Sequence, residues 1–463
     1  MERKNAWAAY AGDDGRVEAF AKAYCDFINN GKTERECVAY GEKLAKAHGF
    51  EDLNAVVRSG RKLEAGARVY ANWMGKSFML FVLGEKPLEE GMNILGAHID
   101  SPRIDVKQNP LYEDTDLAYL DTHYYGGIKK YQWVAIPLAL HGVIVRKTGE
   151  KVIINIGEDE NDPVFCISDL LVHLAQEQMT KNAKEVVEGE ALNLIVGGRP
   201  LEGEEKDAVK ANVLKLLDDK YGVEEEDFLS AELEIVPAGK ARDMGFDRSM
   251  ILGYGHDDRV CAYPSMMAVM DYEGTPDYTL CCIITDKEEI GSVGATGMAS
   301  HYLENTVAEL YACTADYCEL AVRRCLRSSR MLSSDVSAGY DPNFASAFEK
   351  KNSAFLGRGI CFNKFTGSRG KSGSNDANPE FMASLRKIMD DAGVAFQTAE
   401  LGRVDLGGGG TIAYLCAKYG MNVIDSGIPV LSMHAPYEVI SKVDLYEGYR
   451  GYCAFLQGAK PVE

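Results

Sequence analysis

Five short segments of this chain combine histidine or carboxylate side chains with glycine, proline or small residues, each where an apolar run ends. They are GAHIDSP with His98 and Asp100, GHDDRV with Asp257 and Asp258, DKEEIGS with Glu288 and Glu289, SSDVSAG with Asp335, and SMHAPYE with His434. Hard and borderline divalent cations take imidazole nitrogen and carboxylate oxygen as ligands. Two such ions, about 3.5 to 4 Å apart, need at least one carboxylate that bridges them. Together the five segments therefore predict a two-metal site.

The adjacent carboxylates of Glu288 and Glu289 follow the apolar run YTLCCII, residues 278–284, and precede a glycine-rich segment. Neighbouring side chains on a regular strand point to opposite faces, so one site can use both only if the backbone turns at the strand end. We expect such a turn in IGSVGATG. One glutamate then binds metal, and the other acts as general base on the activated water.

Each segment also has a purely structural interpretation. A single histidine is often only hydrogen-bonded within the fold, and acidic pairs are often solvated surface charge, as in EEED at 224–227. Position distinguishes the five segments, because an unpaired charge beside a buried strand is costly. His256 is the competing ligand beside Asp257. We expect the other histidines to be structural, with the exception of His173.

Strands and helices must bring these remote segments together. From about residue 245 onward, strand-like runs alternate with helical periodicity, which favours an α/β layer whose central sheet has helices on both faces. In such sheets, sites form outside the carboxyl ends of the strands. We expect strands in YTLCCIIT, RMLSSDVSA, VAFQTAEL and MNVIDSGIPVLSM, and helices at about 295–302, in PEFMASLRKIMDDAG and in GTIAYLCAKYG.

The N-terminal region is also helical in pattern and leads into two strand candidates, KSFMLFVLG and MNILGAHID. A different texture follows, because VAIPLALHGVIVRKTGEKVIINIG is typical of strand, turn and strand, and acidic polar segments come after it. We therefore expect one discontinuous catalytic domain, residues 1–104 and 243–463, interrupted by a β-rich insertion at 105–242.

Composition excludes some partners. The chain has 463 residues, enough for two domains, and its 50 basic and 70 acidic residues give a net charge of −20, which disfavours nucleic acid and membrane surfaces. It has no signal-like segment and no run of about 18 apolar residues, so we expect a cytoplasmic protein. The twelve cysteines form no CxxC pair, which indicates reduced core cysteines.

In this order, the five segments resemble the motifs of the aspartyl aminopeptidase family of metallopeptidases: GAHxDSP, DN or DD, DxEE[IV]GS, SxD and MH. The likeness covers nearly the whole chain and includes the late GGGGTIAYL and GIPVLSMH. The resemblance implies a three-layer α/β metallopeptidase domain with a mostly parallel central sheet and an inserted β-rich domain used in assembly. It also implies a homo-oligomer, often a dodecamer, that removes the N-terminal residue from peptides with a free N-terminus.

The resemblance also implies roles for the individual residues. Two divalent ions are expected, zinc in the first place with cobalt or manganese as alternatives. The metal ligands would be His98, Asp257 as the bridge, Glu289, Asp335 and His434. Asp100 would orient the imidazole of His98, and Glu288 would be the base. A cis peptide bond between Asp257 and Asp258 is common at such sites.

The substrate-binding candidates come from less specific likeness: His173, Asp341, Lys371, Gly409 and Gly410. His173 stands in ISDLLVHL, which resembles an IPHLAIHL pattern, while Asp341 replaces a family histidine. We expect Asp341 to repel an acidic side chain, so the acidic preference of the family gives way to a neutral or basic one unless Lys364, Arg369 and Lys371 compensate. The four glycines at 407–410 lack the lysine of a phosphate-binding loop and favour a tight turn at a helix start.

Two other functions fit parts of the pattern. A two-metal deacylase or amidohydrolase of N-acyl amino acids would share the bridging carboxylate and the glutamate base. An inactive self-assembling or cargo-like protein would keep the fold without the chemistry.

Overall fold

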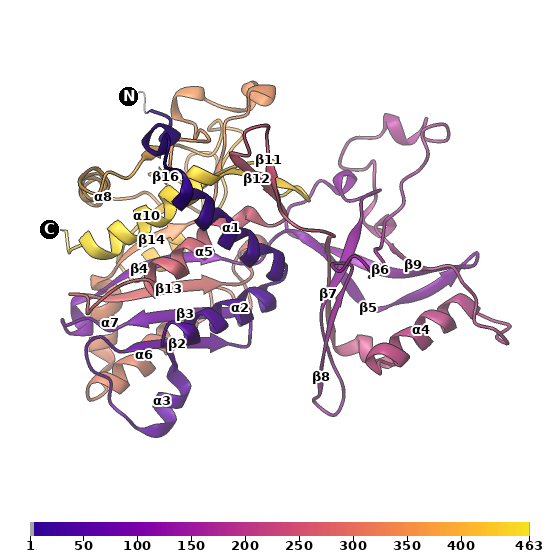
Figure 1. The fold of residues 1–463 in the computed structure, drawn as a ribbon, viewed down its shortest axis with the longest axis horizontal. Coiled ribbons are helices and arrows are strands. Elements are labelled where there is room, and N and C mark those ends of the chain that lie inside the picture. The colour runs from indigo at the N-terminus through magenta and orange to yellow at the C-terminus, as the bar shows by residue number, and fades with distance from the viewer. Residues whose placement is uncertain (1–3, 463) are drawn as a thin grey trace. The chain divides into compact units, whose positions relative to one another are not determined.

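The computed structural model describes residues 4–462, and the chain divides into two compact units (Figure 1). The first unit contains the chain up to Asp100, Ala241–Met433 and everything from Glu438 onward. The second contains Ser101–Lys240 and the short segment His434–Tyr437. The predicted insertion at 105–242 covers most of the second unit's residues, and its role in assembly stays a prediction.

A nine-stranded sheet is the centre of the first unit. Its spatial order is β1 (Glu51–Asp52), β2 (Arg68–Trp73), β3 (Ser77–Val82), β13 (Thr279–Thr285), β4 (Met92–His98), β14 (Arg330–Ser334), β18 (Asn422–Gly427), β16 (Ile360–Asn363) and β17 (Phe396–Thr398). The four neighbours β13, β4, β14 and β18 run parallel. Their carboxyl ends therefore meet at one edge, as expected for an α/β sheet.

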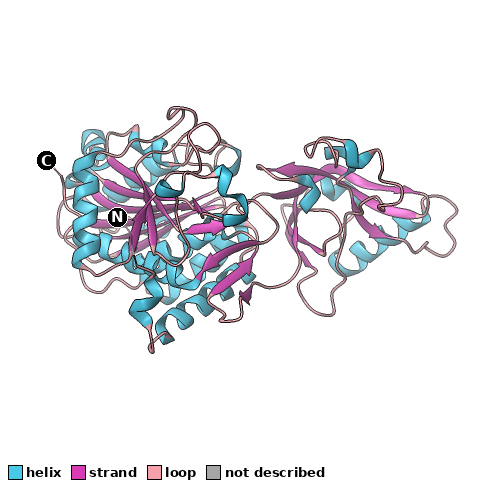
Figure 2. Ribbon diagram, turned by 90° about the horizontal axis from the view of Figure 1, so that it is seen from above, coloured by secondary structure: helices cyan, strands magenta, loops and turns pink. Residues whose placement is uncertain are grey.

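Helices pack on both faces of this sheet (Figure 2). One face carries α1 (Gly15–Asn30), α2 (Glu34–Ala47), α5 (His256–Met270), α8 (Pro379–Asp391) and α10 (Lys442–Gly458). The other carries α3 (Leu53–Ser59), α6 (Tyr302–Thr314), α7 (Glu319–Ser328) and α9 (Ala413–Ala417). Successive strand residues enter opposite clusters, as Cys282 and Cys281 do. The predicted α/β class with covered faces is confirmed.

A second sheet in the first unit has five short strands, in the order β11 (Arg242–Met244), β12 (Met250–Gly253), β20 (Glu438–Ser441), β19 (Pro429–Leu431) and β15 (Ser337–Ala338). Short 3-10 helices complete the unit: η1 (Ala6–Tyr10), η2 (Leu88–Glu90), η7 (Glu288–Ile290), η8 (Pro342–Ala347) and η9 (Lys350–Asn352). Of these, η7 bears directly on the candidate site, because it carries both adjacent glutamates.

The second unit is an antiparallel sheet of six strands with one α-helix among its described residues, α4 (Ala208–Tyr221). The strand order is β8 (Lys151–Ile156), β7 (Leu138–Val145), β10 (Ala231–Pro237), β5 (Arg103–Asp114), β6 (Leu117–Tyr125) and β9 (Leu194–Gly197). The 3-10 helices η3 (Lys130–Gln132), η4 (Gln178–Thr180), η5 (Gly189–Ala191) and η6 (Glu225–Ser230) lie in its connections. The predicted strand, turn and strand are confirmed as the β7–β8 hairpin.

Two helix predictions differ from the structure. Residues 295–301 form turns, and α6 begins only at Tyr302. The chain folds back on itself there, since a Cβ on Gly297 would lie 2.3 Å from the Ser292 carbonyl oxygen. The helix expected in GTIAYLCAKYG is shorter than predicted, because α9 covers only Ala413–Ala417.

All twelve cysteines are free. The prediction that they are core residues is confirmed for the eight that are buried, whereas three are partly buried and Cys318 is exposed. Within residues 4–462, no helix combines the length and apolar character needed to cross a bilayer.

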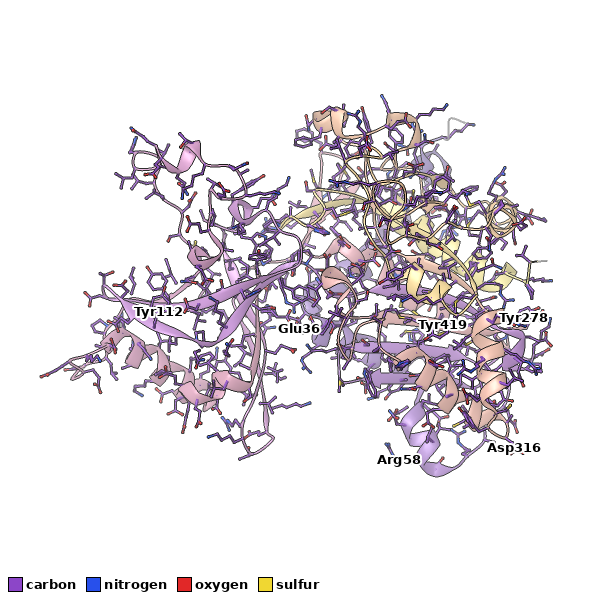
Figure 3. The ribbon with its side chains drawn as sticks, turned by 180° about the vertical axis from the view of Figure 1, so that it is seen from behind. Glu36, Arg58, Tyr112, Tyr278, Asp316 and Tyr419 are labelled. Atoms are coloured by element: carbon purple, nitrogen blue, oxygen red, sulfur yellow. The ribbon has the colours of Figure 1, made fainter. Side chains whose placement is uncertain are left out.

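The start of α2 is fixed by a capping box that supports the edge of the central sheet. Thr33 Oγ1 accepts the Glu36 N–H at 3.2 Å, and the Glu36 carboxylate, labelled in Figure 3, accepts the Thr33 N–H at 3.1 Å. The preceding Lys32 carbonyl accepts a hydrogen bond from buried Arg259, whose Nε also binds the Ile99 carbonyl. Ile99 is the first residue after β4. Because the capping box fixes the backbone beside Lys32, it helps to place Arg259, which in turn holds the chain at Ile99.

Replacing Thr33 by alanine should lower the free energy of unfolding by about 1 kcal/mol, because an amide at the helix start loses its acceptor. Urea denaturation followed by circular dichroism measures this loss. Thr33→Ser keeps the hydroxyl and serves as the control. If the serine variant lost as much stability as the alanine variant, the hydroxyl would not be the stabilising group.

Candidate metal centre

Three neighbouring parallel strands deliver the candidate ligands to one edge of the sheet. His98 is the last residue of β4, Asp335 follows the last residue of β14, and Glu288 and Glu289 stand three and four residues beyond the end of β13. Asp257 comes from the first turn of α5, which packs on β4. The strand topology thus explains why groups more than 200 residues apart in the sequence converge.

His98 is oriented by its two ring nitrogens. Nε2 lies 3.2 Å from Asp257 Oδ1 and 3.9 Å from Asp335 Oδ1, so this nitrogen faces the carboxylates. Nδ1 lies 2.9 Å from the carbonyl oxygen of Asp100 and 3.3 Å from its Oδ1. Burial alone would lower the pKa of His98, but its hydrogen bonds with Asp100 and Asp257 outweigh that effect and raise the pKa well above the usual value. Nδ1 is thereby fixed on Asp100, and Nε2 is left for a cation.

The turn expected after β13 is present and explains the paired glutamates. Lys287 takes a left-handed backbone conformation with φ 66°, and η7 follows at once. The buried carboxylate of Asp100 accepts the N–H of Glu288 at 3.1 Å and that of Glu289 at 3.2 Å. Because the strand geometry ends before them, both side chains reach the same cluster.

The start of α5 departs from helical geometry. The peptide bond between Asp257 and Asp258 is cis, as the resemblance implied, and Asp257 has a ψ of 109°. Its N–H donates to Glu438 Oε2 at 3.0 Å. Asp258 is fully buried and accepts the His98 N–H at 3.3 Å, and burial raises its pKa to about 8. Asp258 and Glu438 thus hold the backbones of ligand candidates, a role that sequence reasoning missed.

The ligand atoms form two groups whose members lie within 4.8 Å of one another: His98, Asp257 and Glu289 in one, and His98, Glu288 and Asp335 in the other. One imidazole nitrogen and carboxylate oxygens are the donor set that zinc, manganese and cobalt accept. Burial and the negative charge of Glu288 raise the pKa of Asp335 well above its usual value. A cation between such carboxylates removes their mutual repulsion, so the residues present fit a bound metal.

Two candidate histidines, His256 and His434, lie outside both ligand groups of the described residues. His256 is not a member of either group among the described residues, because its Nδ1 lies 2.7 Å from the Tyr24 hydroxyl and its ring stacks on that of Tyr24. Burial lowers its pKa to about 3. The competing ligand is therefore a structural residue. His434 belongs to the second unit, where its Nδ1 lies 2.9 Å from the Gly127 carbonyl oxygen, and its role as a ligand stays a prediction.

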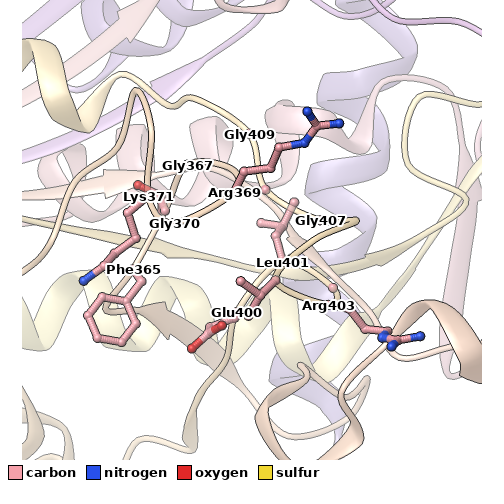
Figure 4. Close-up of a pocket in the computed structure, with 14 residues that line it drawn as sticks. Phe365, Gly367, Arg369, Gly370, Lys371, Glu400, Leu401, Arg403, Gly407 and Gly409 are labelled. Carbon is pink, nitrogen blue, oxygen red and sulfur yellow. The ribbon is translucent and has the colours of Figure 1, made fainter.

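A cavity of about 200 Å³ lies between two loops of the first unit (Figure 4). Its lining includes Lys371 and Gly409 from the predicted substrate-binding set, together with the charged side chains of Arg369, Glu400 and Arg403. Lys371 extends beside Phe365, with its Nζ 4.1 Å from the ring centroid. Sequence reasoning missed Glu400 and Arg403, because nothing in their local pattern distinguishes them from surface charge.

The remaining substrate-binding candidates lie elsewhere. Asp341 and Gly410 are not among the residues that line the cavity, and Asp341 Oδ1 accepts the Asn343 N–H at 2.8 Å at the start of η8. His173 is exposed in the second unit. The glycines that the loop requires are Gly407 and Gly408, where a Cβ would lie 1.6 Å and 2.1 Å from carbonyl oxygens, whereas Gly409 has open space.

Comparison with known proteins agrees with the motif pattern. Residues 27–456 match the profile of the family described as aminopeptidase I zinc metalloprotease, M18. A probable M18 family aminopeptidase 1 from Clostridium acetobutylicum is 58% identical over 459 residues, covering 98% of each chain. The crystal structure of an M18 family aminopeptidase from Thermotoga maritima superposes with a TM-score of 0.94 at 42% identity, covering 99% of this chain and 100% of the other.

A more distant solved structure shares only the fold. The S. cerevisiae mApe1 dodecamer superposes with a TM-score of 0.76 at 20% identity, covering 95% of this chain and 97% of the other.

Asp257→Ala should remove bound metal, since the variant loses the carboxylate nearest to His98 Nε2. Inductively coupled plasma mass spectrometry on protein purified without chelators gives the metal content per chain. Asp341→Asn removes one negative charge outside the two ligand groups and is the matched control. Full metal content in the alanine variant would remove Asp257 from the ligand set.

Proposed function

The chain belongs to the M18 family of aminopeptidase I zinc metalloproteases, and we propose that its aminopeptidase reaction takes place at the cluster around His98 and Asp257. The observation that carries the proposal is the convergence of one oriented imidazole and four carboxylates at the carboxyl ends of three parallel strands. A donor set of this kind favours an active peptidase over an inactive self-assembling protein.

We propose that this cluster holds two divalent cations, zinc in the first place with cobalt or manganese as alternatives. His98, Asp257 and Glu289 would hold one, while Asp257, Asp335 and the motif histidine His434 would hold the other. The cations would polarise the scissile carbonyl and lower the pKa of the attacking water. Glu289 groups with His98 and Asp257, whereas Asp335 groups with His98 and Glu288, which supports separate positions for Glu289 and Asp335.

In the proposed mechanism, the Glu288 carboxylate takes a proton from the attacking water and delivers it to the leaving amine. Asp100 supports both sides of this step. Its carboxylate holds the Glu288 backbone through the N–H, and it lies 3.3 Å from His98 Nδ1. Base and ligand therefore keep a fixed separation, which general base catalysis requires.

We further propose that the cavity in Figure 4 receives the side chain of the N-terminal residue. The neutral or basic preference rested on Asp341, whose carboxylate caps η8 and is not among the lining residues. The lining instead carries the cations Arg369, Lys371 and Arg403 against the single carboxylate of Glu400. Lys371 is partly neutralised, because Asp376 pairs with it at 3.0 Å and with Lys364 at 2.9 Å. The remaining positive charge favours an acidic side chain.

We propose a homo-oligomer with twelve subunits, by analogy with the S. cerevisiae mApe1 dodecamer. An exposed apolar segment of the second unit supports self-association: Leu170, Leu171, Val172, Leu174 and Met179 are 47% to 72% exposed.

The free cysteines support a reducing compartment, and we propose the cytoplasm.

A panel of N-terminal aminoacyl-p-nitroanilides tests the substrate preference. We expect Asp and Glu derivatives to give the highest kcat/KM, because the lining carries excess positive charge. Fastest turnover of Lys or Arg derivatives would contradict this expectation. N-acetylated amino acids, assayed for acetate release, are the control for a deacylase, and hydrolysis of these without cleavage of the free-amine anilides would select that function instead.

Glu288→Gln should lower kcat by at least about 10²-fold, because the amide cannot accept the proton. Metal content should be unchanged, in contrast to Glu289→Gln, which should weaken metal binding. Stopped-flow or steady-state assays with the best anilide measure kcat, and mass spectrometry measures the metal. A loss of only a few-fold in the Glu288 variant would show that another group acts as base.

A further inference from the structure

Two loops line the cavity, the first around residues 365–376 and the second around residues 400–411. The loops are hydrogen-bonded to each other, and the first folds back on itself at its base. In the first loop, Phe365 bridges to Asp376 and Ser368 bridges to Ser372 in antiparallel fashion. The Gly367 N–H donates to the Gly409 carbonyl of the second loop at 2.9 Å. This hydrogen bond couples the two loops, so the loss of any group that holds both of them would release them together.

The group that holds both loops is the carboxylate of Asp425 on β18. Asp425 is 1% exposed, and its Oδ1 accepts the Thr411 hydroxyl at 2.5 Å, at the end of the second loop. Its Oδ2 accepts the Thr366 hydroxyl at 3.3 Å, at the base of the first loop. Thr366 Oγ1 in turn accepts the Asn375 N–H at 3.0 Å, on the opposite side of that loop. One buried carboxylate thus holds both loops by their hydroxyl groups.

Strand β18 also fixes the backbone of a candidate metal ligand, Asp335, which follows β14. Strand β18 pairs in parallel with β14, with Ser426 opposite Ser334, and the Asp335 N–H donates to the Ser426 carbonyl at 3.3 Å. The contact is close, because a Cβ on Gly427 would lie 1.8 Å from the Asp335 carbonyl oxygen. The residues that follow Asp425 therefore fix the backbone of Asp335.

We propose that Asp425 is a positioning residue for substrate binding, which sets the two cavity loops at a fixed place relative to Asp335. This inference rests on the proposed role of the cavity as the side-chain pocket. Asp425 acts through Thr366 and Thr411. Without the hydrogen bonds of Asp425, the two loops lose their fixed position. The free energy needed to order them when substrate binds then weakens binding more than it slows the chemical step.

A matched buried carboxylate distinguishes this role from a general contribution to stability. Asp444 on α10 is also fully buried, and its carboxylate accepts the Gly357 and Gly359 N–H groups, each at 2.6 Å. Burial raises the pKa of both aspartates to about 7. The loop that Asp444 holds contributes no residue to the cavity lining. Asp444→Asn is therefore the control for Asp425→Asn.

The test measures KM and kcat for the best aminoacyl-anilide on the full chain, with metal content determined in parallel. We expect Asp425→Asn to raise KM about tenfold while kcat and metal content stay within about two- to three-fold. Asp444→Asn should leave KM within about twofold. An equal rise of KM in both variants, or a loss of metal or kcat with KM unchanged in Asp425→Asn, would overturn the proposal.

A second pair of variants keeps the test valid if Asp425→Asn does not fold. Thr411→Val removes the hydroxyl at nearly constant volume and should raise KM, whereas Thr411→Ser keeps the hydroxyl and should retain the wild-type KM. An unchanged KM in the valine variant contradicts the proposal. If the wild-type chain cleaves no aminoacyl-anilide, the proposed function fails, and this inference fails with it.

Discussion

The candidate centre depends on the carboxylate of Asp100, which joins the ends of two parallel strands. It accepts the N–H groups of Glu288 and Glu289 beyond β13 and lies beside His98 Nδ1 at the end of β4. Without this carboxylate, two backbone amides would lose their partner, and only the Asp100 carbonyl oxygen, 2.9 Å away, would remain beside the imidazole Nδ1. The carboxylate therefore sets the position of the proposed base and, together with that carbonyl oxygen, the direction of the ligand nitrogen.

Buried ionisable groups surround this interaction, and their removal from water has a cost that the fold must offset. Asp258 is buried and accepts the His98 N–H, and the next residue, Arg259, donates to the carbonyls of Ile99 and Lys32. A buried charge is tolerated only when it is hydrogen-bonded, and here the bonds go to backbone groups of the segments that carry the site. The polar interior near the edge of the sheet thus holds the chain geometry while the carboxylates remain available to a cation.

Much of the fold could be predicted because it depends on local pattern. The continuous apolar run in YTLCCIIT and the glycine that ends PEFMASLRKIMDDAG mark a strand and a helix end wherever the chain places them. The prediction at 295–302 was wrong because Gly297 folds against the Ser292 carbonyl, a contact that only the folded loop reveals. Likewise, four consecutive glycines look equivalent in sequence, yet only Gly407 and Gly408 meet neighbouring carbonyl oxygens at distances that exclude a side chain.

By itself, the sequence supplied the candidate inventory of the site: two imidazoles and several carboxylates at strand ends, in an order that matched a known family of metallopeptidases. It could do so because donor chemistry and motif order are properties of the residues themselves. Only the tertiary structure decided that His256 hydrogen-bonds to Tyr24 instead of joining the cluster, that Asp341 caps a helix outside the cavity lining, and that Asp425 joins two loops. Those outcomes depend on which hydrogen-bonding groups lie within about 3 Å of each side chain, and the packing of helices and loops against the sheet sets these distances.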